Sequence, residues 1–182
     1  LHGGSMALAH KLFVGLSEWF SNIAYKHSAA FVISQRLWKE NAEKFPHRKL
    51  CLLPNSTPQL CKYSRTVFNK PIQLLYTGTY APKDGVAYLI DGAVEAYENG
   101  IDLRLILLGK GLSQDMVVLD KTIGKDYIQY IGYVSDDELK RYLIESDILC
   151  MTRCNSRFAN YGFPFKLSEY LATGNIVLAT NV

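Results

Sequence analysis

From residue 72 onward, short apolar segments alternate with segments of helical character, and this alternation limits the possible folds more than any other feature. The apolar segments are 73–77, 103–108, 127–131, 147–151 and 176–179. The segments expected to form helices are 86–98, about 112–123, 136–145 and a stretch after Pro164 that ends at Ala172. Strands that alternate with helices form βαβ units and a parallel sheet. Because several of these strands are apolar without alternation, both of their faces should be buried. The predicted fold class is therefore α/β, with helices flanking a parallel sheet.

Three of the predicted strands end at a glycine, namely Gly78, Gly109 and Gly132. A fourth strand runs into the long polar loop 152–164. Ligands of parallel sheets bind beyond the carboxyl ends of the strands, where glycine permits a close backbone approach and positive φ. One such glycine would be an ordinary turn residue. Three at successive strand ends modestly favour a phosphate or nucleotide site.

The first 56 residues show a shorter pattern of the same kind. A helix is predicted over 6–27, a strand over 29–33, a helix over 35–44 and a strand over 50–53. Ser34 precedes the second helix as a plausible N-cap. The stretch 55–71 is polar and contains Pro58 and Pro71. We therefore expect one structural region over 1–56, a linker over 57–71 and a second domain over 72–182.

The apolar helix predicted over 6–27 is interrupted by His10, Lys11, Glu18 and Asn22. These polar residues make it a poor candidate for a membrane-spanning segment. A packed core helix is the favoured interpretation. Peripheral contact with a membrane remains the open alternative for this segment.

Composition excludes several classes of protein. Hydrophobic residues make up 48% and charged residues 20% of the chain, as in ordinary globular proteins and unlike disordered ones. The formal net charge of +3 comes without a Lys/Arg run, so nucleic acid is not an expected partner. The four cysteines form no CxxC pair and lack an accompanying His cluster, so no zinc site is expected. Their pattern fits a reduced, cytoplasmic setting.

The most informative stretch is NYGFPFKLSEYLATG, residues 160–174. It resembles the donor-site signature of the GT-B glycosyltransferases of the large group 1 type (family 4). In that family a Gly-rich loop meets a helix that carries a Glu, then Ala-x-Gly, then an apolar strand. The segments LLYTGTYAPKDGV (74–86) and YIGYVS (130–135) are similar to other parts of the same family, in the same order. The resemblance implies a Rossmann-like donor-binding domain over 72–182, incomplete at its C-terminus, preceded by the end of an acceptor domain over 1–56.

The signature segment suggests how a nucleoside diphosphate would be held. A helix N-terminus offers backbone N–H groups and a positive dipole end to a diphosphate. The backbone at Gly162 and Phe163 could approach it closely. By resemblance, Glu169 would hold the nucleotide ribose, because a carboxylate can accept two hydroxyl hydrogen bonds. For Lys166, pairing with phosphate and a place on the solvated helix face are equally open.

The resemblance extends to further donor-site candidates: Gly78, Thr79, Lys83, Gly109, Tyr133, Val134 and Tyr161. Three positions depart from the family pattern. Tyr161 stands where the family usually has a second Glu, and Thr79 stands where it has an Arg. Asp84 occupies the expected place of a Lys, with Lys83 one residue earlier. Fewer cationic contacts should weaken or rearrange phosphate binding, since each charge-assisted hydrogen bond contributes roughly 1.5–3 kcal/mol.

The resemblance implies a glycosyltransferase that moves a sugar from a nucleoside-diphosphate sugar to a saccharide or lipid-linked acceptor, with retention of configuration. A non-catalytic GT-B-like binding subunit is the alternative that the Tyr161 and Thr79 departures favour. A GT-B epimerase acting on a nucleotide sugar is the third. The sequence contains no Asp-x-Asp motif, so no metal and no cofactor besides the donor are expected.

The ends of the chain also carry expectations. The sequence begins with Leu-His-Gly-Gly and ends at Val182, directly after an apolar strand, so we expect a piece of a longer protein. Such a piece should be inactive alone, because GT-B catalysis closes two domains around a cleft. The one catalytic candidate is His2, and an isolated His near a terminus is more often incidental.

Overall fold

The computed structural model describes residues 3–53, 55–57 and 70–181. Two compact units divide the chain, Leu1–Pro54 and Asn55–Val182. Most of the predicted linker 57–71 lies outside the described residues, and so does the catalytic candidate His2.

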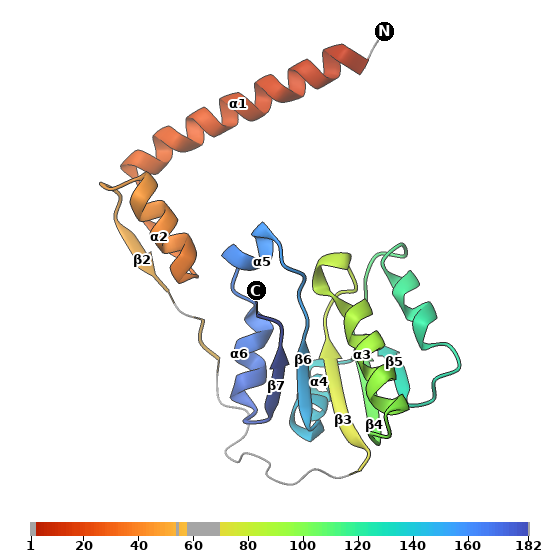
Figure 1. The fold of residues 1–182 in the computed structure, drawn as a ribbon. Coiled ribbons are helices and arrows are strands. Elements are labelled where there is room, and N and C mark those ends of the chain that lie inside the picture. Colours follow the sequence, from red (N-terminus) through yellow and green to blue (C-terminus); the bar gives the residue numbers. More distant parts are fainter. Residues whose placement is uncertain (1–2, 54, 58–69, 182) are drawn as a thin grey trace. The chain divides into compact units, whose positions relative to one another are not determined.

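The first unit is a short βαβ arrangement preceded by a long helix (Figure 1). Its elements are α1 (Gly3–His27), β1 (Ala30–Val32), α2 (Gln35–Lys44) and β2 (Leu50–Leu52). The two strands are parallel, with Phe31 opposite Cys51. Ser34 caps α2 as predicted, because its hydroxyl accepts a hydrogen bond from the Leu37 N–H at 3.2 Å.

The interpretation of residues 6–27 as a packed core helix is wrong for the described part of α1. Its large apolar side chains are exposed: Leu12, Phe13, Val14, Leu16, Trp19, Phe20 and Ile23. The physical reason is that this unit has almost no core for the helix to join. Val32 is the one buried residue among those described in this unit, and a two-stranded sheet is too small to bury a long helix. Among the described residues, no helix combines the length and the hydropathy that a membrane crossing requires.

The second unit contains a five-stranded sheet in which all neighbouring strands are parallel (Figure 1). Its strands are β3 (Ile72–Thr77), β4 (Leu103–Leu108), β5 (Ile128–Gly132), β6 (Ile148–Met151) and β7 (Ile176–Ala179). Their order in the sheet is β5-β4-β3-β6-β7. The chain thus builds outward from β3 in one direction and then returns to build from β3 in the other. The point of reversal lies between β3 and β6, and ligands of such sheets bind there. The predicted α/β fold with a parallel sheet is confirmed.

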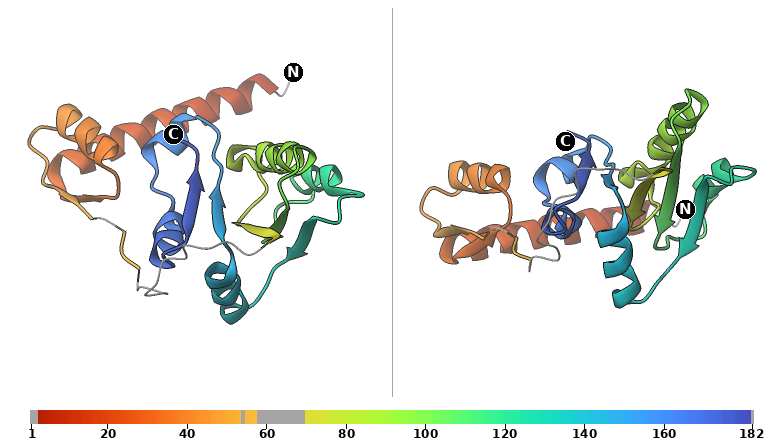
Figure 2. Two further views of the ribbon diagram at one scale, coloured as in Figure 1. Left: turned by 60° about the horizontal axis from the view of Figure 1, so that its bottom comes forward. Right: turned by 90° about the horizontal axis from the view of Figure 1, so that it is seen from below.

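Helices cover both faces of this sheet, and α3 and α4 lie on opposite sides of the strands (Figure 2). The segments on one face are α3 (Val86–Glu98) and the 3₁₀ segment η2 (Met116–Thr122). Those on the other face are α4 (Asp136–Glu145) and α6 (Phe165–Ala172). The start of α4 has a capping box, in which Ser135 and Glu138 bond reciprocally.

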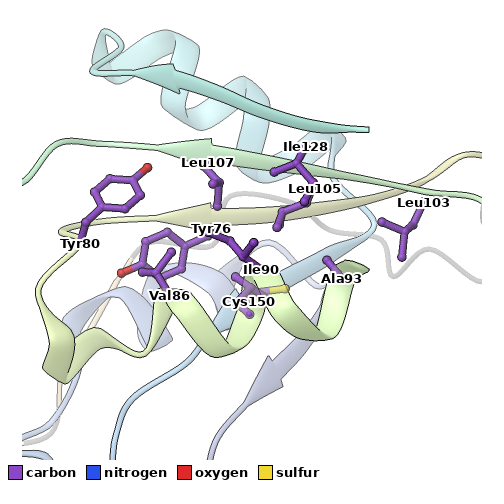
Figure 3. Packing of buried hydrophobic residues seen from close by; sticks show 11 residues of the cluster. Tyr76, Tyr80, Val86, Ile90, Ala93, Leu103, Leu105, Leu107, Ile128 and Cys150 are labelled. Carbon is purple, nitrogen blue, oxygen red and sulfur yellow. The ribbon is translucent and has the colours of Figure 1, made fainter. Parts of the chain in front are cut away.

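On β3, β4 and β6, residues enter cores on both faces of the sheet, which is why these strands are mostly apolar without strict alternation. On β3, Tyr76 joins the core under α3 and Leu75 joins the core under α4 and α6. Figure 3 shows the first core, where Ile90 of α3 lies against Tyr76 and Cys150. Full burial of one Leu or Ile side chain stabilises a fold by about 1.5–3 kcal/mol, so the two cores provide most of the driving force for this unit.

Three segments differ from the predicted secondary structure. The helix predicted over 112–123 is instead a turn followed by the 3₁₀ segment η2. Its adjacent Val117 and Val118 are β-branched, which disfavours an α-helix. The loop predicted over 152–164 contains the short helix α5 (Arg157–Tyr161), and residues 79–84, which lie outside every predicted helix, contain the 3₁₀ turn η1 (Pro82–Asp84). Such single turns bury too few residues to leave a periodic pattern in the sequence.

Candidate functional site

The glycines at the carboxyl edge of the sheet are required first by the packing of the backbone itself. Gly78, Gly109 and Gly132 all have positive φ, at +144°, +106° and +88°. The Gly78 N–H donates to the Leu108 carbonyl at 3.1 Å, and the Gly109 N–H donates to the Gly132 carbonyl at 2.7 Å. A Cβ on Gly109 would run into the backbone carbonyl of Gly78. The turns therefore lie tightly side by side, and this close approach alone explains glycine at position 109.

Lys166 lies at the carboxyl end of β3, although it belongs to the first turn of α6. Its ammonium donates to the Thr77 carbonyl at 2.7 Å and lies 4.8 Å from the centre of the Tyr76 ring. A Cβ on Gly78 would collide with the same ammonium. Burial lowers the pKa of Lys166, and the nearby Asp84 carboxylate partly opposes this effect. Lys166 is thus a half-buried cation at the sheet edge, and not a residue of the solvated helix face.

Tyr170 fixes α6 against the same strand end. Its side chain is fully buried, and its hydroxyl accepts a hydrogen bond from the Thr77 N–H at 3.1 Å. A second hydrogen bond joins this hydroxyl and the Thr77 hydroxyl at 2.8 Å. Burial raises the pKa of Tyr170 to about 12, so the phenol stays protonated at neutral pH. Sequence reasoning missed this anchor, because a Tyr after the helix Glu is also an ordinary core residue.

Asp84 is a buried carboxylate beside these residues, with only 5% of its surface exposed. It ends η1, and its side chain accepts a hydrogen bond from the Thr79 hydroxyl. Its backbone carbonyl accepts a hydrogen bond from the Thr152 hydroxyl at 3.0 Å. The loop after β3 is thereby tied to the loop after β6, across the point where the strand order reverses. Asp84 was noted in the sequence only as a departure from the family pattern.

Two further cations share the electrostatic environment of Lys166. The charges of Arg153 and Lys83 both act to lower the pKa of Lys166, so they lie near its ammonium. Arg153 follows the end of β6, and its backbone is held by two hydrogen bonds to the Thr180 hydroxyl, at 2.8 and 3.0 Å. Sequence reasoning missed Arg153, although a basic residue just after the carboxyl end of a buried strand was an available signal. Together with Lys166, these two cations favour the binding of an anion at this edge.

Glu169 lies on the same part of α6, three residues after Lys166. Its side chain is exposed, and its charge acts on the pKa values of both Lys166 and Tyr170. Glu169 therefore lies near the carboxyl edge of the sheet, with its carboxylate open to a ligand. Pro164 is the N-cap residue of α6 and provides no side-chain hydrogen bond to the helix start.

The remaining predicted residues lie along the same edge but do not all meet. Tyr161 ends α5, and Gly162 and Phe163 form the half-buried turn into α6. Tyr133 follows β5 and is 76% exposed, with the Lys110 ammonium 5.8 Å from its ring centre. Because β4 lies between β5 and β3, Tyr133 is about two strand spacings, roughly 10 Å, from the Lys166 position along the sheet. Val134 packs instead against the core under α4.

A hollow of about 600 Å³ opens on the α3 side of this edge. It is lined by the loop after β3, the start of α3, the segment before η2 and Cys154. The Cys154 thiol donates to the Pro82 carbonyl at 3.2 Å. Among the site residues predicted from the sequence, Lys83 lines this hollow. Within the described residues, no group of three or more His, Cys, Asp or Glu side chains is placed to hold a metal ion.

The fold of the chain is shared with several solved glycosyltransferases of GT-B architecture. The pneumococcal O-GlcNAc transferase GtfA, solved with UDP and GlcNAc, matches 85% of this chain with 19% identity and a TM-score of 0.67. HepE of Anabaena, solved with UDP and glucose, matches 87% of the chain with 17% identity and a TM-score of 0.66. The C-terminal domain of LpcC, a group 1 glycosyl transferase of Francisella tularensis, matches 68% with 15% identity and a TM-score of 0.55.

These matches cover unequal parts of the other proteins. The chain spans 30% of GtfA and 46% of HepE, whereas it spans 70% of the LpcC domain. Comparison with the sequences of curated proteins gives no match. The sequence profile of the family described as "Glycosyl transferases group 1" matches residues 71–182, which is more than half of the chain. The chain therefore belongs to the group 1 glycosyl transferases.

Proposed function

We propose that the second unit binds a nucleoside-diphosphate sugar, and that the protein transfers this sugar to a saccharide or lipid-linked acceptor. The observation that carries the proposal is the position of Lys166. Its ammonium lies at the end of β3, where the strand order reverses, and Glu169 lies one helical turn further on. A cation and an exposed carboxylate at that spacing suit a phosphate and the adjacent ribose.

The chemistry of sugar transfer gives each group a role. When the sugar–phosphate bond breaks, negative charge develops on the departing diphosphate. Lys166, Arg153 and Lys83 would stabilise that charge, and fixed cations stabilise it more in a water-poor site than in water. Glu169 would accept hydrogen bonds from the two ribose hydroxyls. A hexosyl donor and retention of configuration are further parts of the proposal, and they rest on the family.

The first test is a binding measurement, because the proposed donor-site residues all lie in this chain. UDP is the first ligand, since GtfA and HepE were both solved with UDP. Isothermal calorimetry should detect UDP binding, with GDP, ADP and CDP measured in parallel to identify the base. Absence of binding by all four nucleotides would contradict the proposal. Transfer itself requires assays of the complete protein with sugar nucleotides and a range of acceptors.

A non-catalytic nucleotide-binding subunit is the second candidate, and departures from the family pattern favour it. Tyr161, Thr79 and Asp84 stand where the resemblance leads one to expect an acid and two cations. A complete protein that binds UDP but neither transfers nor epimerises any sugar nucleotide would support this candidate. Detection of an epimerised sugar nucleotide would instead identify the third alternative, an epimerase.

A further inference from the structure

The first unit contains a hollow of about 410 Å³ whose lining is dominated by basic side chains. Lys26 and His27 contribute from the end of α1, and residues 44–48 contribute from the end of α2 and the turn that follows. Lys, His and Arg make up five of the seven lining residues, and the other two are Phe45 and Pro46. No Asp or Glu is among these lining residues, all of which lie in the described part of the chain.

Positive charge is concentrated in this part of the chain. Residues 26–49 contain six Lys or Arg and two Glu, which gives this segment a formal charge of +4. The whole chain has a net charge of +3, so the remaining residues together are slightly acidic. The basic character of the hollow therefore does not reflect a generally basic protein.

Helix dipoles explain part of this cluster but not all of it. Lys26, His27 and Lys44 lie in the last turns of α1 and α2, where cations are favoured by the negative end of the helix dipole. His47 and Arg48 come after the end of α2, so the dipole of that helix does not require them. Their presence in the same hollow points to a role in binding an anion.

Arg48 is tied to α2 and its C-cap residue by two hydrogen bonds. Its side chain is half-buried, and its Nη1 donates to the Asn41 side-chain carbonyl at 3.3 Å. Its backbone N–H donates to the Phe45 carbonyl at 3.0 Å, which closes the turn after α2. Phe45 also holds Lys44, whose ammonium lies 5.4 Å from the centre of the ring. Two cations are thus partly positioned before a ligand arrives, which lowers the entropic cost of binding.

The hollow lies at the amino edge of β1 and β2, because its lining residues directly precede these two strands. The donor-site candidates belong to the second unit, at the carboxyl edge of its sheet. The volume of about 410 Å³ is typical of small-ligand sites and can hold a phosphate or diphosphate group. Guanidinium, ammonium and imidazole groups are the side chains that best bind phosphate oxygens.

We propose that this hollow is a second anion site, which binds a phosphate or diphosphate group. The group could belong to a free phosphorylated molecule or to a lipid headgroup, since the recognition chemistry is the same. The two sources differ in one measurable respect. A free group binds from solution as inorganic pyrophosphate, whereas a headgroup binds only when presented on a vesicle of anionic lipid.

The test compares two variants that remove equal charge. Lys26→Gln combined with Lys44→Gln removes two exposed cations from the hollow, and Lys39→Gln combined with Lys49→Gln removes two exposed lysines that do not line it. Pyrophosphate binding is measured by calorimetry, and vesicle binding by co-sedimentation with phosphatidylglycerol or phosphatidylcholine. Both measurements use the Lys166→Ala background, which weakens the contribution of the proposed donor site.

For one of the two ligands, we expect the hollow variant (Lys26→Gln with Lys44→Gln) to bind at least tenfold more weakly than the parent protein. The control variant (Lys39→Gln with Lys49→Gln) should change the affinity for that ligand by less than threefold. Loss of pyrophosphate binding identifies a soluble phosphate, and loss confined to phosphatidylglycerol vesicles identifies a headgroup. Equal loss in both variants would overturn the proposal, because it indicates general charge attraction. Binding of neither ligand by the parent protein would overturn it as well. Arg48→Gln, with folding checked by circular dichroism, should reproduce the effect of the hollow variant.

Discussion

The Lys166 ammonium donates to the Thr77 carbonyl at 2.7 Å, so a residue of α6 provides the cation at the end of β3. The loop directly after β3 has Thr79 and the buried carboxylate of Asp84 at the positions where the family resemblance leads one to expect cations. Besides Lys83 of this loop, the positive charge at this edge comes from elements distant in sequence, Lys166 from α6 and Arg153 from the segment after β6.

Replacing Lys166 with Ala should weaken UDP binding by at least tenfold. The reason is the loss of a charge-assisted contact to phosphate, which contributes roughly 1.5–3 kcal/mol. Calorimetry measures the change, and Lys140→Ala serves as the control, because Lys140 is exposed on α4 in an ion pair with Asp137. Unchanged UDP affinity in Lys166→Ala would remove Lys166 from the site.

Glu169→Ala should weaken UDP binding at least tenfold and have a much smaller effect on 2′-deoxy-UDP. A carboxylate that binds both ribose hydroxyls loses one of these partners when the 2′-hydroxyl is absent. Glu169 therefore contributes less to the binding of 2′-deoxy-UDP, and its replacement by Ala should weaken that binding less. Glu95→Ala, at an exposed position on α3, is the matched control. Equal losses for the two nucleotides would show that Glu169 does not contact the 2′-hydroxyl.

The affinity for UDP should fall as the pH rises. The fall should begin at a lower pH than it would if Lys166 had the pKa of an ordinary lysine. Burial lowers the pKa of Lys166, and Arg153 and Lys83 lower it further, whereas Asp84 and Glu169 oppose the shift. Since the diphosphate needs the ammonium form, affinity is full below the lowered pKa and is lost above it. The ratio of the dissociation constants of wild type and Lys166→Arg, measured from pH 7 to 10.5, cancels the titration of the ligand. A ratio that stays constant over this range would contradict the role of Lys166.

Gly109→Ala should destabilise the protein far more than Gly124→Ala. Both glycines have positive φ, at +106° and +74°, so both substitutions carry a backbone penalty of about 1–2 kcal/mol. Only at Gly109 would the new Cβ meet the Gly78 carbonyl, whereas nothing lies within 4 Å of a Cβ at Gly124. Steric overlap of this kind costs about 1–3 kcal/mol more. Urea denaturation gives the free energies of unfolding, and equal losses would mean that the two turns do not pack as described.

Tyr170→Phe should lower the free energy of unfolding by about 1–3 kcal/mol, because the half-buried Thr77 N–H would lose its acceptor. The substitution preserves the ring and its packing, so the change isolates the hydroxyl. Tyr88→Phe is the control, since Tyr88 is 72% exposed and a change there should stay within about 0.5 kcal/mol. If the free energies of unfolding of the two variants differed by less than about 0.5 kcal/mol, the Tyr170 hydroxyl would not stabilise the end of β3.

Much of the second unit could be predicted because its signals are local. The apolar runs at 72–77 and 103–108 reflect burial on both faces, and the capping box at Ser135 requires only residues within one helical turn. The 3₁₀ segment η2 and the short helix α5 could not be predicted in the same way. Each is a brief turn whose geometry depends on packing with distant residues, such as that of Met116 and Leu119 against the core under α3.

The candidate site shows the same division. Glu169, Lys166 and the strand-end glycines were identified from motif order, and their roles toward a ligand remain predictions. Arg153, Tyr170 and the buried state of Asp84 were missed, because their importance depends on which strands are neighbours. The interpretation of α1 as a core helix failed for a related reason, since an apolar stripe does not specify what covers it.

By itself, the amino-acid sequence determined the alternation of strands and helices and the family that this alternation and its motifs indicate. It could do so because the periodicity of hydrophobic residues, the helix caps and the turn residues each depend on only a few neighbouring positions. The tertiary structure alone decided that β6 returns to lie beside β3. That single adjacency brings Lys166, Arg153 and Asp84 together across some 80 residues of chain. Contacts between distant segments arise only when the sheet assembles, so no local pattern in the sequence records them.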